Sequence, residues 1–165
     1  MIAKLKKLSP ADDIDIYNML QEMPKDENGF MNGANGLSYD DYKQWLIKND
    51  DISNGIDLED WMVAQNIYWL YIDGEPVGVG KLRLRLTDKL RQDGGNCGYG
   101  ITASKRGNGY GKILLKLLVE EARTLEITPL LLTMNTQNET SIKTALANGG
   151  TIEKTVDEKN YIWIH

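Results

Sequence analysis

The stretch Arg106-Gly107-Asn108-Gly109-Tyr110-Gly111 separates a short predicted strand from the clearest helical pattern in the chain. After it, apolar residues recur with the 3.6-residue period of a helix from Ile113 to Leu125. Before it, the segment 96–102 follows Gly94-Gly95 and is predicted to be a strand. Glycines let successive backbone N–H groups converge, and a helix N-terminus adds partial positive charge. A strand, a glycine-rich turn and a helix in this order predict a site for a phosphate or pyrophosphate.

Two nucleotide-binding patterns fail at this turn. The P-loop pattern requires a first glycine and a Ser or Thr after the lysine, but Arg106 and Ile113 stand at those places. The dinucleotide pattern G-x-G-x-x-G has Lys112 in its third glycine position. A third pattern, Arg/Gln-x-x-Gly-x-Gly/Ala, is matched by Arg106, Gly109 and Gly111. The alternative is a glycine-rich turn without a ligand.

The first third of the chain predicts a strand, two helices and a long loop. Ser9 is expected to cap the first helix, with Pro10 as its first residue. The loop 24–38 is either a functional lid or binding loop, or plain surface disorder. Ser38 begins a capping box for the second helix.

The remainder predicts a meander of strands around Asp73-Gly74, a strong hairpin signal. Alternation in 81–86 places Lys81, Arg83 and Arg85 on one face. Arg83 and Arg85 either attract an acidic acceptor or form the solvent-exposed face of the sheet. After the long helix, the pattern indicates a strand at 130–134, a helix at 139–148 and strands at 151–156 and 160–164. The predicted fold class is α+β, with a mixed, mostly antiparallel twisted sheet flanked by helices in a single domain, 1–165.

Composition excludes several classes of protein. The 165 residues are 41% apolar and carry a net charge of −5, which is unlike the basic surface of a nucleic-acid binder. Cys97 is the single cysteine and His165 the single histidine, so disulfide scaffolds, His-based triads and zinc sites are set aside. No signal peptide or membrane span is evident, so a cytoplasmic location without membrane contact is expected.

The Arg106–Gly111 motif, its helix and the later Asn138-Glu139-Thr140-Ser141 with Gly149-Gly150 resemble the GCN5-related N-acetyltransferase (GNAT) superfamily. The order of elements resembles that fold over nearly the whole chain. Further stretches, among them Pro24-Lys25-Asp26-Glu27-Asn28-Gly29-Phe30, Tyr68-Trp69-Leu70 and Gly98-Tyr99, are similar to a bacterial subgroup of predicted acetyltransferases.

The resemblance implies a binding site for acetyl-CoA as co-substrate, with no metal. The pyrophosphate would rest on the backbone of the turn, and the pantetheine arm would lie beside the preceding strand. The implied cofactor-binding residues are Ile101, Thr102, Arg106, Gly107, Asn108, Gly109, Tyr110, Gly111, Lys112, Asn138 and Ser141.

The resemblance also implies direct attack of a primary amine on the thioester in a ternary complex. A lysine-like amine, with a pKa of ~10.4, needs a base to remove its proton. The backbone N–H of Ile101 is expected to stabilise the oxyanion. The tyrosine that usually protonates the leaving thiolate is replaced by Ala145.

Candidate catalytic residues are therefore Tyr99, as acid or orienting group, and Glu22, as base. The alternatives are a packed aromatic ring for Tyr99 and a solvated helix-end acid for Glu22. Cys97 is expected to be a small buried residue rather than a nucleophile.

The expected activity is acetyl transfer to a small-molecule or peptide amine by a monomer or homodimer. Two alternatives stay open: a non-catalytic acyl-CoA sensor, and a transferase of a longer acyl group.

Overall fold

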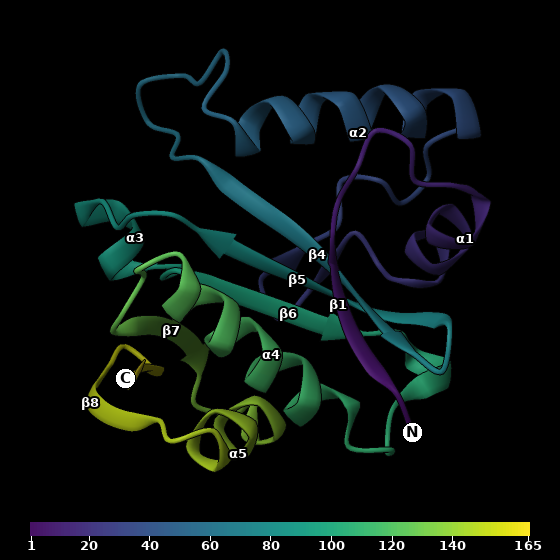
Figure 1. The fold of residues 1–165 in the computed structure, drawn as a ribbon. Coiled ribbons are helices and arrows are strands. Elements are labelled where there is room, and N and C mark those ends of the chain that lie inside the picture. The colour runs from purple at the N-terminus through teal and green to yellow at the C-terminus, as the bar shows by residue number, and fades with distance from the viewer.

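The computed structural model describes residues 1–165, and Figure 1 shows strands crossing the centre of the molecule with helices on both sides. The strands are β1 (Ala3–Lys7), β2 (Asp26–Glu27), β3 (Phe30–Met31), β4 (Gln65–Ile72), β5 (Glu75–Arg83), β6 (Cys97–Ile101), β7 (Leu130–Asn135), β8 (Thr151–Val156) and β9 (Lys159–Ile164). The helices are α1 (Ile14–Glu22), α2 (Tyr39–Ser53), α3 (Asp88–Gln92), α4 (Tyr110–Thr124) and α5 (Glu139–Ala147), with a 3₁₀ turn at Ala103–Lys105.

The strands form two main sheets and one small hairpin. The first sheet has the order β1-β4-β5-β6, and the second has the order β7-β9-β8. Strands β2 and β3 pair only with each other. Every pairing within the sheets is antiparallel. The α+β class, with antiparallel sheets flanked by helices, is confirmed.

The two main sheets separate between β6 and β7, which α4 connects. Asn96, just before β6, donates its N–H to the carbonyl oxygen of Leu131 (2.8 Å), and its Oδ1 accepts the N–H of Leu131 (3.0 Å). Beyond this contact no hydrogen-bonded ladder joins β6 to β7, and they belong to different sheets. A gap lined by strand edges therefore opens along β6.

Apolar side chains fill both faces of the first sheet. Leucines of α4 pack on one face together with β7 and β9, and side chains of α1 and α2 pack on the other around Trp69. Gly80 has no room for a side chain, because a Cβ there would lie 2.6 Å from a methyl carbon of Leu118. Glycines of β5 thus let α4 approach the sheet closely and fix where its N-terminus lies.

The prediction that Ser9 caps the first helix is wrong. Helix α1 begins at Ile14, and Asp13 is its N-cap. The preceding residues instead form a turn around the buried Asp12 carboxylate. Its Oδ2 accepts hydrogen bonds from the Ser9 N–H (2.8 Å) and from the Trp69 indole (2.7 Å). This long-range contact with β4 holds residues 9–12 outside the helix.

Three further differences concern local elements. The loop 24–38 contains the hairpin β2–β3 rather than a wholly irregular segment. Strand β5 ends at Arg83, so Arg85 lies beyond it and is exposed. Helix α3 was missed, although Thr87 caps it with a hydrogen bond from the Leu90 N–H (3.2 Å).

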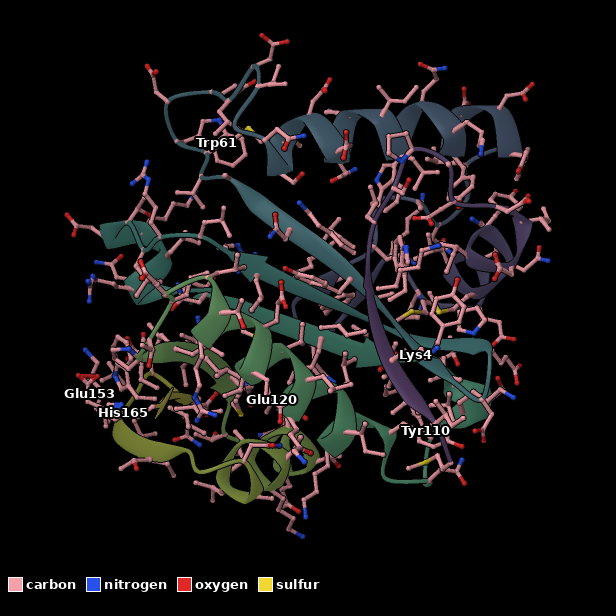
Figure 2. The ribbon with its side chains drawn as sticks, in the orientation of Figure 1. Lys4, Trp61, Tyr110, Glu120, Glu153 and His165 are labelled. Carbon is pink, nitrogen blue, oxygen red and sulfur yellow. The ribbon has the colours of Figure 1, made fainter.

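Figure 2 places His165 and Tyr110 on opposite sides of the view, so the single histidine lies far from the glycine turn. No helix has both the length and the apolar composition needed to cross a bilayer.

Candidate active site

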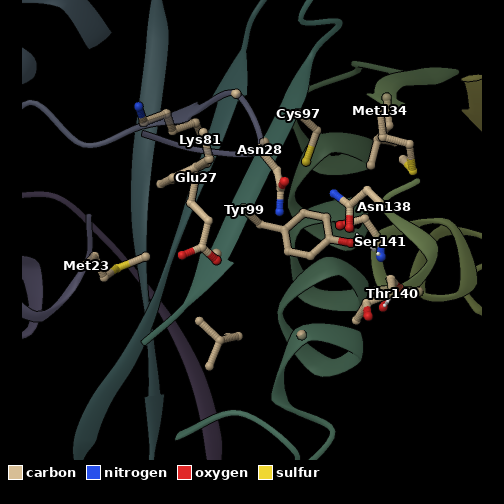
Figure 3. Close-up of a pocket in the computed structure, with 18 of the residues that line it drawn as sticks. Met23, Glu27, Asn28, Lys81, Cys97, Tyr99, Met134, Asn138, Thr140 and Ser141 are labelled. Atoms are coloured by element: carbon tan, nitrogen blue, oxygen red, sulfur yellow. Dashed lines mark hydrogen bonds between the residues drawn. The ribbon is translucent and has the colours of Figure 1, made fainter. Parts of the chain in front are cut away.

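A cavity of ≈710 Å³ lies along β6 and reaches the glycine turn (Figure 3). Its walls come from the hairpin β2–β3, from β5, β6 and β7, and from the N-terminal ends of α4 and α5. Of the residues predicted to bind the cofactor, it brings together Ile101, Arg106, Gly107, Gly109, Tyr110, Gly111, Lys112, Asn138 and Ser141. Tyr99 lines the same cavity.

The glycine turn presents unpaired N–H groups. Gly107 and Gly109 have φ angles of +82° and +79°, which place them in the left-handed region that favours glycine. The N–H groups of residues 107–109 donate to no protein acceptor. Gly109 is the N-cap of α4 and offers no side-chain acceptor to the first turn. The turn is therefore a positively polarised cradle for an anion.

Arg106, the first residue of the motif, fixes the shape of the turn. Its Nε donates to the carbonyl oxygen of Ile101 (3.1 Å), and its Nη2 pairs with Glu27 of the hairpin. Asn108 acts in the same way, because its exposed side chain donates to the carbonyl oxygen of Lys105 (3.0 Å). The side chain of Asn108 thus shapes the turn and is not part of the cavity wall.

One edge of β6 carries unpaired backbone groups. In the ladder with β5, Thr102 donates to Val77 and Arg83 donates to Asn96, so even-numbered residues of β6 bond to β5. The backbone groups of Tyr99 and Ile101 face the opposite edge, toward β7. Apart from the Ile101 carbonyl oxygen, which accepts from Arg106, these groups are free to pair with an extended ligand arm in the gap.

The Tyr99 hydroxyl is buried in the gap between β6 and α5. Burial raises its pKa to about 12, although the nearby side chains of Ser141 and Thr144 act in the opposite direction. The hydroxyl oxygen lies toward Ser141 (Figure 3), but no partner meets the geometry of a hydrogen bond. Tyr99 is therefore a neutral, unpaired donor at neutral pH.

Helix α5 contributes a polar edge to the cavity. Asn138 is its N-cap, and its Oδ1 accepts the N–H of Ser141 at 3.4 Å, which leaves its amide N–H groups available. Both residues line the cavity. Ala145, at the usual tyrosine position, is fully buried in the core. The hydroxyl of Tyr99 approaches the same helix from β6 instead.

Besides Asn108, two predicted residues lie outside the cavity wall. Thr102 is buried, and its N–H and hydroxyl both donate to the carbonyl oxygen of Val77 (3.0 and 3.3 Å). Glu22 ends α1, is exposed, and accepts a hydrogen bond from the Ser104 hydroxyl (2.8 Å). Its role as a base stays a prediction.

Cys97 lines the cavity but is buried, and burial raises the pKa of its thiol to about 12. It is therefore a neutral thiol at pH 7 and a poor nucleophile.

From sequence, the loop 24–38 was a candidate binding loop, but none of its residues was named as part of the site. Glu27, Asn28 and Phe30 of this loop line the cavity. They join the site through contacts that are distant in sequence.

The chain belongs to the acetyltransferase (GNAT) family, whose family model matches residues 31–149. The separated strands β6 and β7 and the glycine turn agree with this family. The sequence prediction of a GNAT acyltransferase is thereby confirmed for the family. No curated protein matches the sequence.

Solved structures share the fold at low sequence identity. A GNAT-family acetyltransferase from Streptococcus pneumoniae has a TM-score of 0.63 and 17% identity, with 98% of each chain covered. N-acetyltransferase PseH from Campylobacter jejuni, in complex with acetyl coenzyme A, has a TM-score of 0.64 and 16% identity over 99% of this chain and 98% of that one. RimL, a ribosomal L7/L12 alpha-N-protein acetyltransferase in complex with coenzyme A, has a TM-score of 0.71 and 14% identity, covering 98% and 92%.

Proposed function

We propose that this protein transfers the acetyl group of acetyl-CoA to a primary amine by direct attack in a ternary complex. The observation that carries the proposal is the single cavity that joins the unpaired glycine turn to the open edge of β6. Membership of the family and the PseH complex with acetyl coenzyme A support it.

The residues present fit an acyl-CoA. The free N–H groups of residues 107–109 and the first turn of α4 would hold the pyrophosphate, with Lys112 adding charge. The open edge of β6 at Tyr99 and Ile101, and the amide of Asn138 opposite, would hold the pantetheine arm. Thr102 would support this edge from the core, because its hydrogen bonds to Val77 anchor the end of β6.

Acetyl-CoA supplies a thioester, whose carbonyl is open to attack by a neutral amine. The N–H of Ile101 would donate to the oxyanion that forms on that carbonyl. The Tyr99 hydroxyl would donate its proton to the sulfur that leaves, because it is protonated at neutral pH and lies in the gap beside the side chains of Ser141 and Thr144.

Glu22 is the proposed proton acceptor for the amine, acting through water because its carboxylate is exposed outside the cavity wall. Ser104→Ala removes the hydrogen bond between these side chains, whereas Glu22→Gln removes the basic carboxylate and keeps an oxygen that can accept the Ser104 hydroxyl. If Glu22 is the base, only Glu22→Gln lowers kcat and removes the acidic limb of its pH profile. Equal behaviour of the two variants would assign Glu22 a structural role.

The test of the proposed function is release of free CoA thiol from acetyl-CoA with a panel of amines. We expect acceptor-dependent release with at least one amine. A sensor is the second candidate, favoured by Ala145 at the usual tyrosine position. Tight acetyl-CoA binding with no release for any amine would favour the sensor, and no binding at all would overturn both.

The third candidate, a transferase of a longer acyl group, differs in donor length. Comparison of acetyl-CoA with butyryl-CoA and hexanoyl-CoA in the same assay separates it. The proposal predicts the highest kcat/KM for acetyl-CoA, and a higher value for a longer donor would contradict it.

A further inference from the structure

The lining of the cavity continues onto the face of β5 and β6 that points away from α4, and we call this part of the cavity the second compartment. Residues of β5 alternate between the two faces: Gly78 and Gly80 lie against leucines of α4, so Lys81 and Arg83 project to the other side. There the hairpin residue Phe30 packs over β6, where Gly98 and Gly100 have no side chains. The compartment is therefore walled by the hairpin, β5 and the bare face of β6.

Two cations in this compartment have no carboxylate partner. Of the cationic residues that line the whole cavity, Lys105 pairs with Glu75 and Arg106 pairs with Glu27. Lys112 belongs to the glycine turn. Lys81 and Arg83 take part in no ion pair. Asp93, which also lines the cavity, pairs with Lys159 and acts on Arg83 only as a nearby negative charge that raises the pKa of Arg83.

The two unpaired side chains are held in place by neutral acceptors. Arg83 Nη1 donates to the carbonyl oxygens of Gly94 (3.1 Å) and Gly95 (3.2 Å). The Lys81 ammonium donates to the carbonyl oxygen of Met31 and lies 4.7 Å from the centre of the Phe30 ring. These contacts orient both charges without neutralising them, and Figure 3 shows Lys81 beside the hairpin, apart from Tyr99.

Burial makes this arrangement unfavourable without a ligand. Burial lowers the pKa of Lys81 to about 8, with repulsion from Arg83 as the second cause, and burial also lowers the pKa of Arg83. Neighbouring side chains on one face of a strand are about 7 Å apart, close enough to share one anionic group. Uncompensated charges withdrawn from water are costly, and a bound anion would offset that cost.

We infer that Lys81 and Arg83 bind a negatively charged group of the acceptor, so that the substrate is an amine that also carries a carboxylate or a phosphate. This inference rests on the proposed function, because it assigns the second compartment to the acceptor. The sequence left two alternatives for Arg83 and Arg85: Arg83 lines the cavity and fits the first, whereas Arg85 is exposed and fits the second.

The first experiment measures anion binding without requiring turnover. The protein is saturated with CoA to occupy the glycine turn, and inorganic phosphate or acetate is titrated at constant ionic strength. We expect wild-type protein to bind one or both anions, with the preferred anion identifying the group. Charged hydrogen bonds of this kind predict that Arg83→Gln or Lys81→Met raises the Kd about 10-fold or more.

Two variants keep this experiment decisive. Arg83→Lys retains a charge at position 83 and is expected to recover part of the affinity if Arg83→Gln disturbs the turn at Gly94. Arg85→Gln removes a charge outside the cavity and is expected to leave the Kd unchanged. If Arg83→Gln and Lys81→Met bind phosphate and acetate with the same Kd values as the wild-type protein, the inference is overturned.

The second experiment compares acceptors in pairs: ethanolamine with phosphoethanolamine, and glycinamide with glycine. In at least one pair, we expect the amine that carries the phosphate or carboxylate to have the higher kcat/KM. Arg83→Gln is expected to remove that preference. Preference for ethanolamine and glycinamide, which lack the anionic group, would overturn the inference while leaving the acetyltransferase proposal intact. Failure of CoA to bind would instead overturn the proposed function, and the anion titration without CoA would then test Lys81 and Arg83 alone.

Discussion

At the scale of single residues, the site depends on side chains whose ordinary partners are missing. Tyr99 has a buried hydroxyl without a hydrogen bond, and the half-buried Lys81 has no carboxylate partner. Both types of group are normally satisfied when they are withdrawn from water. Their orientation toward one cavity therefore indicates ligands as their partners.

Replacement of Tyr99 by Phe removes the proposed proton donor while keeping the ring. We predict that kcat for acetyl transfer falls about 100-fold, at the lower end of the range for general acid catalysis, with little change in acetyl-CoA affinity. Tyr161→Phe is the matched control, because its hydroxyl bonds to Gln92 outside the cavity (2.7 Å). Wild-type kcat in Tyr99→Phe would contradict the role.

Lys81 predicts a dependence of stability on pH. Its pKa is lowered from 10.5 to about 8 in the folded protein, so between these values the unfolded chain holds a proton that the folded chain has lost. The contribution of Lys81 to the free energy of unfolding therefore rises with pH through this window. At pH 7 the folded protein is destabilised by the full cost of keeping Lys81 charged.

Urea unfolding of Lys81→Met and wild type at pH 7 and pH 10 measures this effect. The variant is expected to gain stability relative to wild type at pH 7, and the difference should narrow by pH 10. Lys4→Met, at an exposed position of β1, is the control and should show no such narrowing. A difference that stays constant or widens for Lys81→Met would contradict the burial of its charge.

At the scale of elements, the sequence predicted helices and strands that depend on local patterns, and it failed where contacts distant in sequence decide the structure. The period of α4 and the residues of the glycine turn are local, so sequence located that unit correctly. The start of α1 was misplaced, because the Asp12–Trp69 hydrogen bond joins residues 57 positions apart. The hairpin β2–β3 was missed as an element because each of its strands has only two residues.

The glycine turn itself can be tested with one substitution and one control. Gly109→Glu adds a charged side chain at a φ of +79°, beside the proposed pyrophosphate. Gly55→Glu makes the same change at a φ of +72° after α2, outside the cavity. Both should lose roughly 1 kcal/mol of stability from backbone strain.

We expect only Gly109→Glu to abolish acetyl-CoA binding, as measured by isothermal titration calorimetry. Retained affinity in this variant would move the cofactor site away from the turn.

At the scale of the whole molecule, the net charge of −5 is compatible with anionic ligands because the binding groups are local. The glycine turn uses backbone N–H groups, and the second compartment uses two cations on one strand. Composition alone could not reveal either, since both depend on β5, the hairpin and α4 meeting around β6. The glycine turn was thus predictable from sequence, whereas the placement of Lys81 and Arg83 in the cavity required the fold.

Acetyl-CoA binding should stabilise the whole fold. At 100 times the Kd, a ligand adds about 2.7 kcal/mol to the free energy of unfolding. For a domain of this size, each 1 kcal/mol raises Tm by about 2–4 °C, so we expect a rise of roughly 5–10 °C. Differential scanning calorimetry measures the shift, and adenosine at the same concentration is the control that lacks the pyrophosphate and thioester. An equal rise with adenosine would argue against the assigned turn.

The most direct test of the central claim is a structure determined with bound acetyl-CoA. The account predicts its pyrophosphate on the backbone of Gly107 to Gly111, its pantetheine arm along the open edge of β6, and its thioester beside Ile101 and Tyr99. Acetyl-CoA bound elsewhere, with the gap between β6 and β7 empty, would contradict it.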